Sequence, residues 1–262
     1  MKIAFAGKGG TGKTTIAAWT GDYLARQGYD VWLIDADTAM SLGRASGLTE
    51  EEIPSPLTEY KEIIEERIGI GLLNLNPEVK DLPEKLSVEV PIIGETIAKI
   101  SPGRKRLLVM GTVQSAGSGC ACGANALLKA LLAHLLYEDN VWIIIDLEAG
   151  VEHLGRGTVE KVDVLAIVSE LSLRSLETAK KVSKLSYELG LQDQLLLLNR
   201  VQDEKIFETA AQELKNGLPE KFVIFPEYQG LFTNMLESAS VMNLPEREVI
   251  DQIIEEMIAM IS

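Results

Sequence analysis

The sequence predicts an α/β fold in which helices cover both faces of one doubly wound, mostly parallel sheet. Short runs rich in Val, Ile and Leu recur along the chain with helical stretches between them, which is typical of parallel strands buried on both faces. The length of 262 residues and the 46% share of hydrophobic residues suit one large core. We therefore expect a single domain over residues 1–262.

Each apolar run predicts one strand. The predicted strands cover residues 2–7, 30–37, 106–112, 141–149, 163–170, 194–201 and 221–227. We expect helices in most intervals, for example at Lys13 to Gln27, Ala124 to Tyr137 and Ser172 to Leu189. The interval at about 49–105 is too long for one crossover and contains six prolines. It predicts an insertion with short elements of its own, and a candidate surface for a partner.

Charge and cysteine content exclude several classes of protein. The 39 Asp and Glu outnumber the 25 Lys and Arg, giving a net charge of −14, and no basic stripe is present, so we expect no nucleic-acid partner. The N-terminal MKIAFAG lacks the pattern of a signal peptide and the chain has two cysteines, which predicts a cytoplasmic protein. The apolar stripe over residues 249–261 faces an acidic side. It predicts a packed terminal helix and no membrane partner.

A glycine-rich segment follows the first predicted strand and matches the phosphate-binding pattern GxxxxGK[ST] from Gly7 to Thr14. Glycines allow consecutive backbone N–H groups to face an anion, and the helix that follows adds the positive end of its dipole. We expect Lys13 to reach the β- and γ-phosphates and the Thr14 hydroxyl to bind Mg²⁺. The predicted nucleotide-binding residues of this segment are Gly9, Gly10, Thr11, Gly12, Lys13, Thr14 and Thr15.

A second lysine, Lys8, lies inside this loop. The sequence KGGTGKTT resembles the deviant Walker A loop of the family that contains MinD, ParA and the nitrogenase iron protein. That resemblance implies that Lys8 crosses a dimer interface to the partner's nucleotide, and so predicts a homodimer with ATP. A cation delivered in trans is worth roughly 10³ to 10⁵ in rate in GTPases.

Three aspartates stand at the ends of predicted strands, where an open α/β sheet binds ligands. Asp35 and Asp37 close the second strand, and Asp146 closes IIID. The resemblance implies that Asp37 is the switch I aspartate that positions the attacking water, and that Asp146 is the switch II aspartate near Mg²⁺. The predicted catalytic residues are Lys8, Lys13 and Asp37, and the predicted Mg²⁺ residues are Thr14, Asp37 and Asp146. Thr38 stands where family members often have proline. For Asp35, capping a strand or orienting Lys13 is as good an interpretation as a direct role.

The base is predicted from the end of another strand. A GTPase of this general fold shows the pattern NKxD, whereas Asn199 is followed by Arg200, Val201 and Gln202. Without the guanine-binding carboxylate, ATP is the expected nucleotide. We expect Asn199 to form hydrogen bonds with the edge of the adenine. Arg200, or the loop at Pro226 and Glu227, should line the pocket for the base.

The two cysteines, Cys120 and Cys122, form a CxC between glycines. Two thiolates can chelate one metal ion but leave a tetrahedral site two ligands short. A two-fold dimer would bring the same patch from both subunits together and supply four thiolates. Two small apolar loop residues, or a redox disulfide, remain the alternatives.

The resemblance becomes more specific when the segments are taken together. The loop, GSGCACGANALLKALLAHL and IIIDLEAGVEHLGRGT are similar to the CooC-type nickel-insertion ATPases, which serve carbon monoxide dehydrogenase. This resemblance implies a dimer-bridging Cys₄ site for Ni²⁺ or Zn²⁺, made by Cys120 and Cys122, and carbon monoxide dehydrogenase as client. The alternatives are a positioning ATPase of the MinD or ParA type without metal, and an iron–sulfur carrier ATPase.

Overall fold

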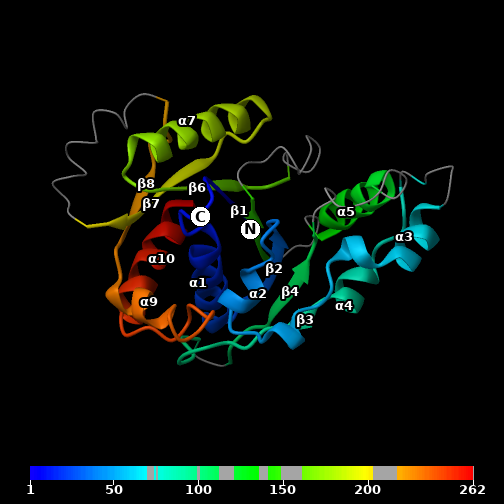
Figure 1. Ribbon diagram of the computed structural model, residues 1–262, viewed down its shortest axis with the longest axis horizontal. Coiled ribbons are helices and arrows are strands. Elements are labelled where there is room, and N and C mark those ends of the chain that lie inside the picture. The colour runs from blue at the N-terminus through cyan, green and yellow to red at the C-terminus, as the bar shows by residue number, and fades with distance from the viewer. Residues whose placement is uncertain are drawn as a thin grey trace.

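One sheet forms the centre of the molecule, with the strand order β3-β4-β2-β5-β1-β6-β7-β8 (Figure 1). The computed structural model describes residues 1–69, 74, 76–98, 101–111, 121–135, 141–148, 161–202 and 217–261. Within them β3 is antiparallel to β4, and every other pair of neighbouring strands is parallel. The predicted fold class is confirmed.

The first half of the chain builds β1, β2, β3 and β4 and the helices around them. The elements are β1 (Lys2–Ala6), α1 (Lys13–Arg26), β2 (Asp30–Ala36), α2 (Leu42–Ala45), the 3₁₀ turns η1 (Glu50–Glu52) and η2 (Leu57–Glu59), α3 (Lys61–Ile68), α4 (Leu82–Leu86), β3 (Val88–Glu89) and β4 (Lys105–Val109). The interval 49–105 therefore contains short elements, as expected. Its status as an insertion stays a prediction.

The second half adds β5 to β8 and the remaining helices. These are α5 (Ala121–Leu135), β5 (Val141–Leu147), β6 (Val164–Ser169), α7 (Leu173–Glu188), β7 (Gln194–Val201), β8 (Phe222–Pro226), α9 (Gln229–Asn234) and α10 (Arg247–Ile261). Two details of the prediction were wrong. Helix α5 begins at Ala121 and not at Ala124, and the two-residue strand β3 was not foreseen because so short a run has no periodicity.

Two hydrophobic clusters fill the space above and below the sheet. One joins α3, α5 and α7 to one face through buried residues such as Ile64, Leu131 and Leu176. The other joins α1 and α10 to the opposite face through residues such as Ile16 and Ile254. Figure 1 shows α7 on one side of the strands and α1 and α10 on the other. No helix among the described residues is long and apolar enough to cross a membrane.

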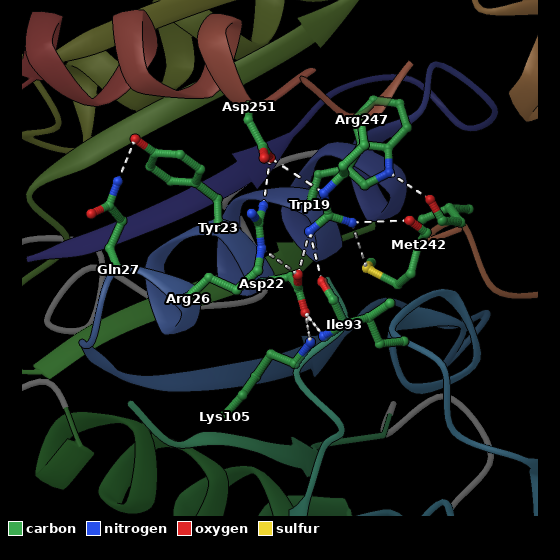
Figure 2. Close-up of polar contacts among 11 residues, drawn as sticks. Trp19, Asp22, Tyr23, Arg26, Gln27, Ile93, Lys105, Met242, Arg247 and Asp251 are labelled. Carbon is green, nitrogen blue, oxygen red and sulfur yellow. Dashed lines mark hydrogen bonds and ion pairs between the residues drawn. The ribbon is translucent and has the colours of Figure 1, made fainter. Parts of the chain in front are cut away.

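A buried group of ion pairs ties three of these elements together (Figure 2). The carboxylate of Asp22, on α1, is fully buried and contacts Lys105 at the start of β4 and Arg247 at the start of α10. Arg26, one turn further along α1, donates to Asp22 at 3.1 Å and to Asp251 on α10. Burial alone raises the pKa of Asp22, but Lys105 and Arg247 together hold it below the usual value. The carboxylate therefore stays charged.

Candidate nucleotide-binding site

The loop between β1 and α1 has the shape of an anion cradle. Gly12 precedes the first residue of α1 and has a left-handed backbone with φ of 97°, which favours glycine. The Thr11 hydroxyl donates to the Lys8 carbonyl at 2.8 Å, and the Thr11 N–H reaches the same oxygen at 3.3 Å. A turn over residues 8–11 therefore closes the loop directly before the positive end of the α1 dipole.

The loop leaves room for a ligand above its backbone. A Cβ atom added at Gly9 or Gly10 would meet no atom within 4 Å. Lys13 is 5% exposed, and its ammonium nitrogen lies 3.7 Å from a carboxylate oxygen of Asp37. An open backbone cradle with a buried cation beside it has the chemistry that phosphate groups need.

Two aspartates meet at the carboxyl edge of the sheet. Asp35 on β2 and Asp146 on β5 are register partners, and both are fully buried. The Thr14 hydroxyl, in the first turn of α1, donates to Oδ2 of Asp146 at 2.6 Å. The other oxygen, Oδ1, is buried without a hydrogen-bond partner among the described residues. A hydroxyl beside a carboxylate with an unpaired oxygen fits the oxygen ligands that Mg²⁺ prefers.

Burial makes both carboxylates unusually basic. Desolvation raises the pKa of Asp146 to about 7, opposed by the hydrogen bond from Thr14 and increased by the charges of Asp35 and Asp37. Desolvation likewise raises the pKa of Asp35 to about 7, against the hydrogen bonds that it accepts from the backbone of Leu42 and Asp37. A divalent cation would stabilise the charged form of Asp146 and remove this penalty.

The segment after β2 is organised by Asp35. Its two oxygens accept the N–H groups of Asp37 at 3.3 Å and Leu42 at 2.9 Å. Between these two anchors the chain turns sharply, with φ of 45° at Met40. The Asp35 carboxylate therefore holds both ends of the loop that carries Asp37, while an effect on Lys13 and a direct role both stay predictions.

At the end of β7, Asn199 and Arg200 point to different surroundings. The amide nitrogen of Asn199 donates to the Thr11 carbonyl at 2.7 Å, and the side chain is buried. Arg200 pairs with Glu170 at 2.7 Å. A pocket of about 390 Å³ lies beside it, with Gln202 and Glu227 also in its wall. Pro226 pairs with Val201 in the sheet. Base recognition by Asn199, Arg200, Pro226 and Glu227 stays a prediction.

The remaining predicted residues lie at the same edge or outside the described part of the chain. Lys8 and Thr15 lie at the two ends of the cradle, and their roles stay predictions. Cys120 lies outside the described residues. Cys122 falls in the first turn of α5, with only its backbone described. No group of three or more potential metal ligands occurs among the described residues. The Cys₄ site therefore stays a prediction.

Sequence reasoning missed contacts between residues that lie far apart in the chain. Two examples are the buried pair of Asp22 and Lys105, from α1 to β4, and the hydrogen bond from Asn199 to the Thr11 carbonyl. The partners are 83 and 188 residues apart in the chain. Lys105 stands between two arginines, two residues before the apolar run that starts at Leu107, so no local signal in the sequence indicated that it would be buried.

Comparison with known proteins agrees with this geometry. A family model described as the CobQ/CobB/MinD/ParA nucleotide binding domain matches residues 2–255. An uncharacterized ATP-binding protein of Methanocaldococcus jannaschii is 39% identical over 210 residues, covering 78% of this chain and 76% of that protein. The carbon monoxide dehydrogenase accessory protein CooC of Rhodospirillum rubrum is 39% identical over 208 residues, covering 77% and 74%. A chain of the MinC:MinD cell division protein complex of Aquifex aeolicus superposes with a TM-score of 0.67 at 22% identity, covering 98% and 95%.

Proposed function

Because the chain belongs to the CobQ/CobB/MinD/ParA nucleotide-binding family and is an ATPase, we propose that it is a metallochaperone driven by ATP. In this proposal two copies dimerise with ATP and hold Ni²⁺, or Zn²⁺ in its place, between the four thiolates of Cys120 and Cys122. The metal is cargo, and carbon monoxide dehydrogenase is the client. We expect the protein to act in the cytoplasm.

The nucleotide part of the proposal rests on the cradle. Backbone N–H groups of residues 9–12 and the Lys13 ammonium would hold the phosphates, and Thr14 and Asp146 would hold Mg²⁺, with Asp37 at its edge. Bound there, Mg²⁺ would neutralise charge on the β- and γ-phosphates. The buried oxygen of Asp146 that lacks a partner would then gain one.

Hydrolysis in this proposal depends on two further side chains. Asp37 is 8% exposed and is held by the N–H of Ala39 at 2.9 Å, so its carboxylate has a fixed position from which to orient a water molecule. Lys8 would be delivered to the nucleotide of the partner subunit, where its charge stabilises the transferring phosphoryl group. Hydrolysis would thus require both copies.

The observation that carries the metal part is the CxC, in a chain that is 39% identical to CooC of Rhodospirillum rubrum over 208 residues. Cys122 lies in the first turn of α5, and in our proposal the dipole of this helix would favour the thiolate that binds metal. Thiolates accept Ni²⁺ and Zn²⁺ alike.

A backbone hydrogen bond connects the strand that carries Asp35 with the segment that precedes the CxC. Asp35, whose carboxylate anchors the loop with Asp37, accepts the N–H of Met110 on its carbonyl at 2.8 Å. Met110 follows β4, and the chain then runs through Gly111 toward the CxC. In our proposal a shift of the loop after β2 is passed through this contact to the segment that precedes the CxC.

The test is a metal count in each nucleotide state. Protein is loaded with Ni²⁺ or Zn²⁺ without nucleotide, with ADP and with ATP, and bound metal and oligomeric mass are measured. We expect one ion per dimer, lost in Cys120→Ser/Cys122→Ser. His134→Ala, which removes a potential ligand from the far end of the same helix, is the matched control and should keep its metal. Full retention of metal by the double cysteine variant would contradict the Cys₄ site.

A positioning ATPase of the MinD or ParA type is the second candidate, favoured by the family itself. The terminal helix speaks against a lipid-binding version, because Ile250, Ile254 and Met257 on its apolar face are fully buried against the sheet. Co-sedimentation with anionic liposomes or with DNA would favour this candidate. An iron–sulfur carrier would instead show visible absorption and acid-labile sulfide after anaerobic purification.

A further inference from the structure

A contact between β7 and the phosphate loop points to a role for Asn199 that differs from reading the base. We propose that Asn199 is a positioning residue, which sets the orientation of the Thr11–Gly12 peptide so that its N–H faces the phosphates. The inference rests on the ATP site of the proposed function and deepens it. It requires neither the dimer nor the cargo metal.

The first observation is the hydrogen bond itself. The Asn199 amide nitrogen donates to the Thr11 carbonyl at 2.7 Å, and both side chains are buried, at 6% and 2% exposure. A buried carbonyl whose donor is removed keeps the cost of desolvation. The bond is therefore a specific constraint on the loop.

The second observation is steric. A Cβ atom built at Gly12 would lie 2.2 Å from the Asn199 amide nitrogen. The asparagine side chain thus lies directly against the loop backbone and occupies the space that a side chain at position 12 would need. Gly12 and Asn199 are fitted to each other, in addition to the requirement for glycine that a φ of 97° imposes.

The geometry of the peptide bond links these contacts to phosphate binding. The Thr11 carbonyl and the Gly12 N–H belong to one planar trans peptide, in which the two groups point in opposite directions. Holding the carbonyl toward β7 turns the N–H away from β7, and in our proposal toward the phosphates. No hydrogen bond occupies the Gly12 N–H among the described residues. It is therefore ready to meet an anion.

The strand is shaped to deliver this side chain. Arg200 has a left-handed backbone with φ of 58°, and the pairing of β7 with β8 is irregular between Leu198 and Val201. A non-glycine residue at positive φ is strained, and such strain is frequent at functional sites. Here the strained residue lies where two successive side chains point to different places. Asn199 contacts the phosphate loop, and Arg200 pairs with Glu170 at the surface.

The test compares ATP with inorganic tripolyphosphate, which has no base. Dissociation constants are measured by calorimetry with Mg²⁺ for the wild type, Asn199→Ala and Asn199→Leu. We expect both ligands to bind about tenfold more weakly to each variant, which corresponds to roughly 1.4 kcal/mol, with their affinity ratio unchanged. Weaker ATP binding with unchanged tripolyphosphate binding would assign Asn199 to the base and overturn the proposal, as would unchanged binding of both.

Controls separate this role from a loss of structure. Gln194→Ala removes a carboxamide that bonds to Ser183 and Leu191 at the opposite end of β7, and should lower stability without changing either affinity.

A double-mutant cycle tests the contact between Gly12 and Asn199. Adding Asn199→Ala to Gly12→Ala should cause no further loss of affinity, because the alanine methyl has already broken the contact. Fully additive losses of affinity would contradict the proposed contact between Asn199 and the loop. A wild type that binds no ATP would refute the proposed function, whereas a wild type that binds ATP but not tripolyphosphate would refute the preformed cradle.

Discussion

The chemistry of the candidate site depends on carboxylates whose surroundings differ. Asp37 is held by a backbone N–H and lies near Lys13, whereas Asp35 and Asp146 are fully buried, with pKa values raised to about 7. Such separation of environments lets neighbouring acids take different roles. In our proposal Asp37 acts on water, Asp146 on Mg²⁺ and Asp35 on the loop.

For Asp37, the substitution Asp37→Asn keeps the size of the side chain and its acceptor for Ala39 but removes the charge. We expect kcat for ATP hydrolysis to fall by roughly 10² to 10⁴, with the dissociation constant for ATP changed only a few-fold. Steady-state kinetics and calorimetry measure both. Asp30→Asn, at the opposite end of β2, is the control, and an Asp37→Asn enzyme with normal kcat would remove Asp37 from catalysis.

For Asp35, the raised pKa makes stability depend on pH. Its folded pKa of about 7 lies above its ordinary value of 3.8, so its contribution to the free energy of unfolding is full below about pH 4 and is lost as the pH rises through 7. Asn mimics the neutral acid. The stability of Asp35→Asn relative to wild type should therefore increase between pH 4 and 7 and level off above, as measured by urea unfolding without Mg²⁺ or nucleotide.

The carboxylate of Glu52 provides a control of opposite sign. Hydrogen bonds from the backbone and side chain of Thr49 lower its pKa, so its contribution is present at neutral pH and is lost as the pH falls through the folded value. The relative stability of Glu52→Gln should therefore decrease with rising pH. A flat difference curve for Asp35→Asn would show that this carboxyl group titrates normally in the folded protein.

At the scale of elements, the ion pairs in Figure 2 fix α1, β4 and α10 relative to one another. Buried charges stabilise little over an apolar alternative, but removing one partner leaves the other uncompensated. Burial lowers the pKa of Lys105, an effect that Asp22 opposes. The main effect of these ion pairs is therefore to determine which elements pack together. Their net contribution to stability is smaller.

Removal of the Asp22 charge should accordingly be costly. We expect Asp22→Asn to lower the free energy of unfolding by about 3 to 5 kcal/mol, since Lys105 and Arg247 lose their shared partner. Glu89→Gln breaks the exposed pair with Arg104, the residue next to Lys105, and should cost far less, because exposed ion pairs contribute little to stability. Urea unfolding compares the two. Similar losses in both variants would mean that burial of Asp22 has no special consequence.

Elements with a strong local signal were predicted from the sequence, and contacts between distant elements were not. The apolar runs gave β7 at its observed bounds, 194–201, and placed β1, β2, β5 and β8 within two residues at either end. The loop over Gly7 to Thr14 was recognised because glycine and lysine spacing is local. The start of α5 was missed because CACGAN has weak helix propensity. The Asp22–Lys105 and Asn199–Thr11 contacts were missed because partner choice in a core is not written in any short segment.

At the scale of the whole molecule, the site opens along one edge of the sheet. The loop after β1, the segment after β2 and the end of β7 all lie there, because parallel strands end at the same edge. In the proposed dimer this edge faces the partner, with Lys8 crossing over. In a two-fold symmetric contact, the Lys8 of each subunit would reach the nucleotide of the other subunit.

The dimer leads to a prediction about Lys8. We expect wild type to shift from monomer to dimer mass with ATP in light scattering, and Lys8→Ala to stay monomeric and to hydrolyse ATP at least roughly 10³-fold more slowly. Lys2→Ala changes a lysine at the other end of β1 and should behave as wild type. If Lys8→Ala dimerises and hydrolyses ATP normally, the trans role of Lys8 is wrong.

Helix α1 has a further consequence for how the molecule moves. Of its 14 residues only Thr14 and Thr15 are not buried, so the helix lies between the sheet, α2 and α10 with almost no surface of its own. A helix so enclosed cannot slide without opening the core. Its amides should therefore exchange with deuterium only through global unfolding, and changes in exchange on nucleotide binding should be confined to the loops at its end.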